Sequence, residues 1–375
     1  MKILFTGGGS GGHIVPIIAI VREIRKIYSK EDLQFFFIGP KDEFSSILLS
    51  QEGIKVKQVL AGKIRRFSGW KTIFQNLADI FFKIPLGIVQ SFFQIFFISP
   101  DLIFSKGGFG SIPGVISGKL LFTPIFLHES DVTPGLANRF IARFVFEVFV
   151  SFPKTEYFPS EKMILSGNPI RKEILDSSKE EAKYFFKLNS EKPVVLILGG
   201  SQGSQRINDE ILEILPNLLE NFEIILQSGE KNFPQVKAEV EAVINNKDLE
   251  KSFHLFPFFK EHELRLAFGA SDLIVSRAGS GSIFEIAAAG KPSILIPLPE
   301  SAQNHQVKNA YAFAENQACL VMEESNFTSH FFLEKLKYLF LHPQELKNMS
   351  EKAKEFSKPQ AAKIIANYLV EYLTK

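Results

Sequence analysis

Short continuous runs of apolar residues alternate along the chain with longer segments in which apolar residues recur at helical spacing. Several of these runs end directly in glycine or in a polar turn. Continuous apolar runs separated by helical segments are typical of a parallel sheet covered by helices on both faces. The expected strands are residues 2–5, 34–38, 101–104, 124–127, 194–198, 223–226, 252–256, 272–275 and 293–296.

Two pairs of segments resemble each other within the chain. Residues 101–112 (DLIFSKGGFGSI) and 272–283 (DLIVSRAGSGSI) agree at eight of twelve positions, with Lys106 at the place of Arg277. Residues 3–11 (ILFTGGGSG) are echoed by residues 195–203 (VLILGGSQG). Because both pairs occur in the same order, the pattern indicates two duplicated units, each with two glycine-rich turns between a strand and a helix.

The duplication predicts an α/β fold of two Rossmann-like, doubly wound parallel-sheet lobes that face a central cleft. The turn-forming residues 166–169, Ser-Gly-Asn-Pro, mark the expected boundary. The helical C-terminal end has no glycine turn of its own and is long enough to cross back onto the first lobe. We therefore expect a first domain of residues 1–168, completed by a helix at 350–375, and a second domain of residues 169–349.

The composition excludes several classes of protein. With 43 Lys plus Arg against 41 Asp plus Glu, the formal net charge is +2, so the surface has no general field for nucleic acid and we expect no nucleic-acid partner. Hydrophobic residues at 45% and charged residues at 22% exclude a disordered or coiled-coil chain. The single cysteine, Cys319, excludes a disulfide framework and a cysteine zinc site, and it is typical of a reducing compartment.

Residues 63–97 combine basic residues, the only Trp and many large apolar residues. Basic flanks with aromatic anchors are typical of a helix that lies in a bilayer interface on anionic lipid. The alternative is an ordinary core helix, since the chain has 39 Phe residues, and both can hold on opposite faces. The charge-free residues 84–100 fall short of the roughly 20 that a spanning helix needs, so we expect no membrane crossing there. The apolar run that follows Met1 is too short for a signal peptide.

A glycine turn between a strand and a helix presents backbone N–H groups at the positive end of a helix dipole, which is a site for phosphate. None of these turns ends in Gly-Lys-Ser/Thr, so a P-loop is not expected. A dinucleotide site needs an acid after the second strand, where this chain has Gly39-Pro40-Lys41. A nucleotide-sugar, with two phosphates, a ribose and a sugar, fits the turns better.

Candidate side chains accompany these turns. Glu285 follows the turn at 279–282 in the expected first turn of a helix, as a ribose ligand or as an acid that complements the helix dipole. Arg171 and Ser201 are candidates to steady a departing diphosphate, Arg171 being otherwise a surface arginine. His13 and Asp131 are candidate bases for an acceptor hydroxyl, although an isolated histidine is more often structural. No pattern of metal ligands is present, so we expect no metal and no cofactor.

Six motifs taken together resemble the MurG family of N-acetylglucosaminyltransferases, in order from residue 3 to about residue 325. They are residues 8–13 (GGSGGH), 128–139 (HESDVTPGLANR), 167–171 (GNPIR), 199–203 (GGSQG), 285–292 (EIAAAGKP) and 304–310 (NHQVKNA). Many members of the family have Gln-Asn where this chain has Ser130-Asp131, so an aspartate that can act as a base replaces an amide.

The resemblance implies a GT-B fold and an inverting transfer of N-acetylglucosamine from UDP-N-acetylglucosamine to the 4-hydroxyl of lipid I, which forms lipid II. The first lobe would bind the lipid acceptor and the second the UDP-sugar. It implies that His13 is the catalytic base or positions the acceptor, while Asp131, where the chain departs from the family, is the other candidate base. It implies substrate binding by Ser10, Gly11, Gly12, Asn138, Arg171, Ser201, Phe259, Ser280, Gly281, Ser282, Glu285, Gln306 and Asn309. Of these, Phe259 would read uracil through its backbone, with a register open by one or two residues.

The resemblance also implies a peripheral enzyme on the cytoplasmic face of the cell membrane, with an anionic membrane surface and cell-wall synthesis proteins as partners. Another GT-B transferase, such as a diacylglycerol glycosyltransferase, or a nucleotide-sugar epimerase is the alternative enzyme. A catalytically inactive binding module is the alternative outside enzymes.

Overall fold

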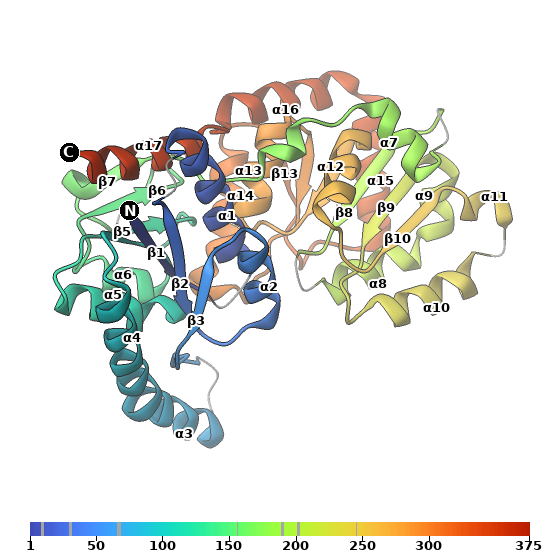
Figure 1. Cartoon of the computed structure of the whole chain (residues 1–375). Helices are drawn as coiled ribbons and strands as arrows, with labels where there is room; N and C mark the ends of the chain where they lie inside the picture. Colours follow the sequence, from blue (N-terminus) through green and yellow to red (C-terminus); the bar gives the residue numbers. More distant parts are fainter. Residues whose placement is uncertain are drawn as a thin grey trace. The chain divides into compact units, whose positions relative to one another are not determined.

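The computed structural model describes residues 1–8, 11–29, 32–65, 69–155, 157–188, 191–200, 203–244 and 246–375. The chain divides into two compact units (Figure 1). Unit 1 consists of Met1–Ile170 with Pro359–Lys375, and unit 2 consists of Arg171–Lys358. The helix α16 (Pro343–Phe356) therefore belongs to unit 2, and only the last helix, α17 (Ala361–Thr374), belongs to unit 1.

Within the described residues, unit 1 contains a sheet of seven strands in the order β3-β2-β1-β4-β5-β6-β7, and all neighbouring strands are parallel. The helices α1 and α17 pack against one face of this sheet, and α4 and α5 pack against the other. The strands are β1 (Lys2–Gly7), β2 (Gln34–Gly39), β3 (Lys55–Gln58), β4 (Leu102–Gly107), β5 (Ile125–Glu129), β6 (Glu147–Val150) and β7 (Met163–Leu165). The helices are α1 (Gly11–Ile27), α2 (Glu43–Gln51), α3 (Trp70–Ala78), η1 (Asp79–Lys83), α4 (Ile84–Ile98), η2 (Phe109–Ser111), α5 (Ile112–Leu120), α6 (Leu136–Ile141) and η3 (Ser160–Lys162).

Unit 2 contains, in its described part, a parallel sheet of six strands in the order β10-β9-β8-β11-β12-β13. The strands are β8 (Val194–Leu198), β9 (Glu223–Gln227), β10 (Phe253–Phe256), β11 (Leu273–Ser276), β12 (Ser293–Leu295) and β13 (Leu320–Val321). The helices before β11 are η4 (Lys172–Leu175), α7 (Lys179–Phe186), α8 (Gln205–Glu213), α9 (Leu215–Asn221), α10 (Phe233–Val243), α11 (Lys247–Glu250) and α12 (Glu261–Ala270). The later helices are α13 (Ser280–Ala289), η5 (Ala302–Asn304), α14 (His305–Ala314), α15 (Ser329–Leu341) and α16.

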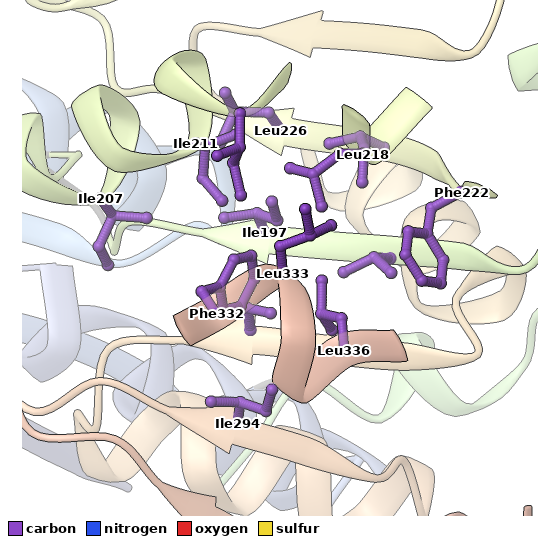
Figure 2. Close-up of a cluster of buried hydrophobic side chains, with 14 of the residues drawn as sticks. Ile197, Ile207, Ile211, Leu218, Phe222, Leu226, Ile294, Phe332, Leu333 and Leu336 are labelled. Carbon is purple, nitrogen blue, oxygen red and sulfur yellow. The ribbon is translucent and has the colours of Figure 1, made fainter. Parts of the chain in front are cut away.

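Each face of the unit 2 sheet has its own hydrophobic core. On one face, β-branched and leucine side chains of the strands meet the apolar faces of α8, α9 and α15, as Figure 2 shows. The side chains there are almost completely excluded from water, so this core is held by the burial of apolar surface. It includes Ile197 and Leu226 from the sheet, Ile207 and Ile211 from α8, and Phe332, Leu333 and Leu336 from α15.

The two sheets confirm the predicted fold class of two doubly wound parallel α/β units. In both units the first strand lies in the middle with the fourth strand beside it, as β1 with β4 and β8 with β11. The repeated segments 101–112 and 272–283 therefore occupy the same topological place in the two units. The nine predicted strands all exist: 194–198 agrees at both ends, and the ends of the others differ by at most three residues.

Four strands were not predicted, namely β3, β6, β7 and β13. Three of them are the outermost strands of their sheets, and β6 is next to an edge. Edge strands are short and need to bury little apolar surface, so they carry a weak signal: β3 (Lys-Val-Lys-Gln) has a single apolar residue, Val56.

The segments α3, η1 and α4 form one continuous helix, Trp70–Ile98, of 29 residues. Its most apolar 18-residue window has a mean hydropathy of 1.6 and is 17% buried, so by length and composition the helix could cross a membrane. The sequence expectation considered residues 84–100 alone and underestimated this length. The helix extends away from the sheet of unit 1 at its α3 end (Figure 1).

This helix buries small and polar residues and exposes large aromatic ones, which is the reverse of the pattern of a helix that packs on a hydrophobic core. Its buried stripe contains small or polar residues, Gly87 and Ser91, followed by Ile95 and Ile98, and α4 packs here against α5. A Cβ atom on Gly87 would lie 1.9 Å from the carbonyl oxygen of Leu60, so glycine permits this close approach. The aromatic residues point outward instead: Trp70, Phe74, Phe81, Phe82, Phe93, Phe96 and Phe97 are all more than half exposed.

Candidate active site

The glycine turns of unit 1 lie at the carboxyl edge of its sheet, after β1 and after β4. His13 is in the first turn of α1, and its Nδ1 atom lies 3.3 Å from the backbone carbonyl oxygen of Lys106. Because a carbonyl oxygen only accepts, Nδ1 carries the proton and Nε2 carries the lone pair. Burial, and next the charge of Lys106, lower the pKa of His13 to about 4. His13 is therefore neutral at physiological pH and can accept a proton or a hydrogen bond through Nε2.

A buried chain of hydrogen bonds fixes the loop beside His13. Asn138, only 5% exposed, donates from Nδ2 to Oε2 of Glu129 at 2.7 Å and accepts from the backbone N–H of Gly108 at 2.9 Å. A Cβ atom on Gly108 would lie 3.1 Å from Nε2 of His13. Glycine at 108, with a φ of 80°, thus brings the backbone close to the imidazole. Both polar ends of Asn138 are therefore engaged within the protein, where they hold the Gly108 turn against Glu129.

Asp131 follows β5 at the same edge, and its backbone N–H donates to Oε1 of Glu129 at 2.9 Å. The carboxylate charge of Asp131 acts on both His13 and Lys106. The two predicted bases, His13 and Asp131, therefore share one electrostatic site in unit 1. Burial, and next the charge of Asp131, raise the pKa of Glu129 to about 7.

His128, at the end of β5, makes a structural hydrogen bond inside unit 1. It is fully buried, and its Nε2 lies 3.1 Å from the backbone carbonyl oxygen of Gly167, to which it donates. Burial, and next the charge of Lys106, hold the pKa of His128 well below the usual value. His128 is thus a neutral structural histidine that ties β5 to the loop after β7.

In unit 2, two predicted ligands of the UDP-sugar bind each other. Arg171 donates from Nε to Oε1 of Glu285 at 2.9 Å and from a terminal nitrogen to Oε2 at 3.1 Å. Glu285 is the sixth residue of α13, so the expected position in the first helical turn is wrong by one turn. From the second turn it cannot act as an acid that complements the dipole, because that effect falls off within the first turn. Its partner is Arg171.

The N-terminus of α13 borders open space. Gly279 precedes the helix and Gly281 is its second residue, and a Cβ atom on either would meet no other atom within 4 Å. Gly200, in the turn after β8, is equally open. Backbone N–H groups of the first helical turn have no partner within the helix, so an anion can approach them here. Ser280 and Ser282 flank Gly281 in this turn, with Ser280 buried and Ser282 half-buried.

Phe259 is buried at 2% exposure with its ring against Phe256, the ring centroids being 4.8 Å apart. Its backbone N–H donates to Oε1 of Gln227 at 3.2 Å, and Nε2 of Gln227 donates to the carbonyl oxygen of Gly200 at 3.0 Å. Gln227 therefore ties the segment after β10 to the glycine turn after β8. The sequence analysis missed Gln227; its signal is a polar residue at the carboxyl end of an otherwise apolar strand.

Gln306 and Asn309 both belong to α14, and both support loops. Oε1 of Gln306 accepts from the backbone N–H of Leu298 at 3.0 Å. Asn309 is fully buried and donates from Nδ2 to the carbonyl oxygen of Ala278 at 3.3 Å, in the turn before α13. Asn309 thus shapes the loop that presents the α13 N-terminus.

The four remaining predicted ligands lie in the glycine-rich parts of the sequence after β1 and β8: Ser10, Gly11, Gly12 and Ser201. Ser10 and Ser201 lie outside the described residues. Gly11 is the first residue of α1, and Gly12 follows it at an exposed position. Among the described residues, no group of three or more His, Cys, Asp or Glu side chains could hold a metal ion.

Two family models match the chain: the glycosyltransferase family 28 N-terminal domain over residues 3–150 and the C-terminal domain of the same family over residues 194–365. The UDP-N-acetylglucosamine–N-acetylmuramyl-(pentapeptide) pyrophosphoryl-undecaprenol N-acetylglucosamine transferase of Clostridium tetani is 37% identical over 351 residues, 93% of this chain and 92% of the relative. A Bacillus cereus transferase of the same name, numbered 2, is 34% identical over 100% of this chain and 99% of the relative.

Solved structures show the same fold. MurG of Acinetobacter baumannii superposes with a TM-score of 0.72 at 23% identity and covers 99% of both chains. A UDP-GlcNAc 2-epimerase from Neisseria meningitidis, bound to UDP-GlcNAc, superposes with a TM-score of 0.65 at 16% identity, over 99% of this chain and 100% of the epimerase. Fold alone does not separate these two, but the full-length sequence identity does. The chain belongs to the MurG family within glycosyltransferase family 28.

Proposed function

We propose that this chain transfers N-acetylglucosamine from UDP-N-acetylglucosamine to lipid I and forms lipid II for peptidoglycan. The observation that carries the proposal is identity of 34–37% to transferases of that name over 93–100% of the chain. In the reaction the 4-hydroxyl oxygen of the muramoyl sugar bonds to the anomeric carbon of N-acetylglucosamine. The bond from that carbon to the UDP oxygen breaks, the configuration inverts, and the hydroxyl proton passes to a base.

The acceptor side of the reaction belongs to unit 1. Nε2 of His13 carries a lone pair, because Nδ1 is bonded to the Lys106 carbonyl oxygen. We assign His13 to accept the hydrogen bond of the attacking hydroxyl, with the Asp131 carboxylate close enough to stabilise the imidazolium that forms. Gly12 is the second residue of α1, directly before His13, and Asn138 holds the loop at Gly108 in place.

The donor side belongs to unit 2. The N-terminus of α13 offers N–H groups of its first turn to the diphosphate, and the space beside Gly200 is open, which supports stabilisation of departing UDP by backbone dipoles and Arg171. Glu285 would accept from the ribose hydroxyls, and the backbone carbonyl oxygen of Phe259, whose N–H is bonded to Gln227, would pair with uracil. Gln306 would contact the transferred sugar, Ser201 would contact phosphate, and Asn309 would act through the α13 loop.

The enzyme would act from the cytoplasmic face of the membrane, held there by the helix Trp70–Ile98. One face of this helix is packed on α5, and it also contains Lys71, Asp79 and Lys83, with Asp79 held by Lys83 at 2.6 Å and by Arg65 at 2.8 Å. A helix bound to its own domain along one side, with charges in its middle, favours lying in the interface over spanning the bilayer. The exposed Phe side chains would enter the acyl boundary.

The test is a transfer assay with purified protein, UDP-N-acetylglucosamine carrying a labelled sugar, and lipid I in detergent. We expect labelled disaccharide lipid and one UDP per transfer, with or without EDTA. Parallel reactions contain diacylglycerol as acceptor, or no acceptor at all. Transfer to diacylglycerol, epimerisation at C2 without an acceptor, or no binding of UDP-sugar would each replace the proposal with one of the alternative functions.

A further inference from the structure

Lys106 is a buried cation that the reaction as described does not use. It lies at the carboxyl end of β4, beside the turn that contacts His13, and it is 2% exposed. Its ammonium donates a hydrogen bond to the hydroxyl of Ser130, and Ser130 donates to Oδ1 of Asn168 at 3.0 Å. An ammonium has three N–H donors, so this single bond leaves much of its charge uncompensated by direct contacts.

The equivalent cation of unit 2 is, by comparison, bonded to a carboxylate and to further acceptors. Arg277 occupies the same position of the internal repeat and is also buried, at 8% exposure. It donates to Oε1 of Glu324 at 2.6 Å, to the hydroxyl of Ser204 at 2.6 Å and to the carbonyl oxygen of Ile296 at 3.2 Å. By contrast, within the described part of the chain no carboxylate lies within ion-pair distance of Lys106.

Burying an ammonium without an ion pair costs free energy, and for Lys106 the nearby charges of Glu129 and Asp131 offset part of that cost. Its neighbours indicate what the charge does. The carbonyl oxygen of Lys106 bonds to Nδ1 of His13, and the ammonium bonds to the residue directly before Asp131. The backbone of Lys106 therefore contacts one candidate base, its side chain reaches the residue next to the other, and its charge acts on His13.

We propose that Lys106 is a positioning residue of the transfer site, whose charge faces the carboxylates of Glu129 and Asp131 and disfavours protonation of His13. The proposal rests on the proposed function for its catalytic consequence, but the coupling of Lys106 to His13 stands without it. The charged or titratable groups around His13 are Lys106 at the end of β4, Asp131 after β5, and Glu129 and His128 on β5. Burial lowers the pKa of Lys106 to about 8, so the ammonium is mostly charged at neutral pH.

The direction in which each substitution shifts the pKa of His13 follows from the charge that it removes. A neighbouring cation disfavours imidazolium, so Lys106→Met should raise the pKa of His13, by roughly 1–2 pH units for a like charge at this range. A neighbouring anion favours imidazolium, so Asp131→Asn should lower it. The double variant removes both charges and should return the pKa of His13 close to the parent value.

The experiment measures the His13 titration directly, by NMR of protein with labelled histidine and without any substrate, with the signal assigned by His13→Gln. The variants are Lys106→Met, Lys106→Gln, Asp131→Asn and the double variant. The matched control is Lys2→Met, because Lys2 donates to the Ile98 carbonyl oxygen at 2.8 Å at the opposite edge of the same sheet. Thermal unfolding of each variant verifies that it is folded.

The expected result is an upward shift in both Lys106 variants, a reversal in the double variant, and no shift in Lys2→Met. A His13 titration that stays within about 0.3 pH units of the parent in both folded Lys106 variants would overturn the proposal. If the role of Lys106 were merely structural, its substitution would change the unfolding temperature without moving the titration of His13.

A second readout separates this proposal from the proposed function. If His13 accepts the hydroxyl proton, the acidic limb of the transfer rate moves upward in Lys106→Met by the same amount as the NMR titration. A shifted titration with an unmoved limb would support the coupling and remove His13 as the base. A shifted titration in a protein with no transfer activity would support the coupling and refute the proposed function.

Discussion

Arg171 and Glu285 form a two-pronged ion pair, with bonds of 2.9 Å and 3.1 Å, across 114 residues of sequence. The pair joins the first residue of unit 2 to the second turn of α13. Both residues are proposed ligands of the same nucleotide-sugar, for its diphosphate and its ribose. Each therefore holds the other in place before the substrate arrives, which reduces the ordering that binding requires.

The first prediction concerns this pair. Glu285→Ala should weaken UDP binding by about 1–3 kcal/mol, because a charged hydrogen bond to ribose is lost and Arg171 loses its anchor. Isothermal calorimetry with UDP measures this. The matched control is Glu181→Ala, which removes a carboxylate from the ion pair with Arg265 elsewhere in unit 2. Unchanged UDP affinity in Glu285→Ala would remove Glu285 from the site.

Gly281→Ala should separate stability from binding. Its added methyl group would meet no protein atom within 4 Å, and alanine is favoured over glycine in a helix by up to about 1 kcal/mol. The variant should therefore be as stable as the parent or more stable, and yet bind UDP-N-acetylglucosamine less tightly, because the methyl group occupies the space of the ligand. Thermal unfolding without ligand and calorimetry with ligand test the two parts. Equal affinity would mean that the open space at α13 is not where the UDP-sugar binds.

The buried His128 predicts a pH dependence of stability. Its pKa in the folded protein lies well below the usual value of 6.5, so unfolding takes up a proton below that pH and stability is lost as pH falls. Between pH 7 and pH 5 one such histidine costs about 2 kcal/mol.

We expect His128→Gln, whose amide can still donate to the Gly167 carbonyl oxygen, to lose about 2 kcal/mol less stability than the parent over that range. Denaturant unfolding at the two pH values gives the comparison, and the change at Glu129 cancels because both proteins contain it. Equal losses in parent and variant would show that His128 titrates alike in the folded and unfolded chain.

The last prediction concerns the outward aromatic face of α4. Replacing Phe93, Phe96 and Phe97 by Ser should abolish co-sedimentation with vesicles that contain anionic lipid, because these exposed rings supply the apolar contact. The control triple, Tyr184→Ser, Phe331→Ser and Leu341→Ser, removes exposed apolar groups from unit 2 and should bind vesicles like the parent. Membrane binding that survives the Phe93, Phe96 and Phe97 changes would place the membrane contact elsewhere.

The sequence predicted the central strands of both sheets, because each is a continuous apolar run, and several of these runs end in glycine or in a polar turn. It also predicted the end of α13 at Gly290, which adopts a left-handed φ of 60° as a glycine that follows a helix commonly does. It missed β3, whose backbone pairs with β2 although its side chains are mostly polar. Backbone pairing at an edge depends on the neighbouring strand and leaves little trace in the residues themselves.

For the candidate site, the sequence identified the residue types and the turns but not their partners. His13 and Asp131 stood out as groups that can take a proton, yet nothing in the sequence shows that Lys106 contacts His13 and the residue before Asp131. Glu285 was expected one turn too early, and its bond to Arg171 spans a distance in the chain over which local patterns say nothing.

Residue order by itself determined the fold class, the duplication and the family, because these follow from the period of apolar residues and from motifs contiguous in the chain. The tertiary structure decided which groups meet: the Arg171–Glu285 pair, the Asn138 support of Gly108, and the inverted face of the helix Trp70–Ile98. The physical reason is that burial and charge coupling act through space, so the pKa of His13 depends on groups about 90 residues or more away in sequence.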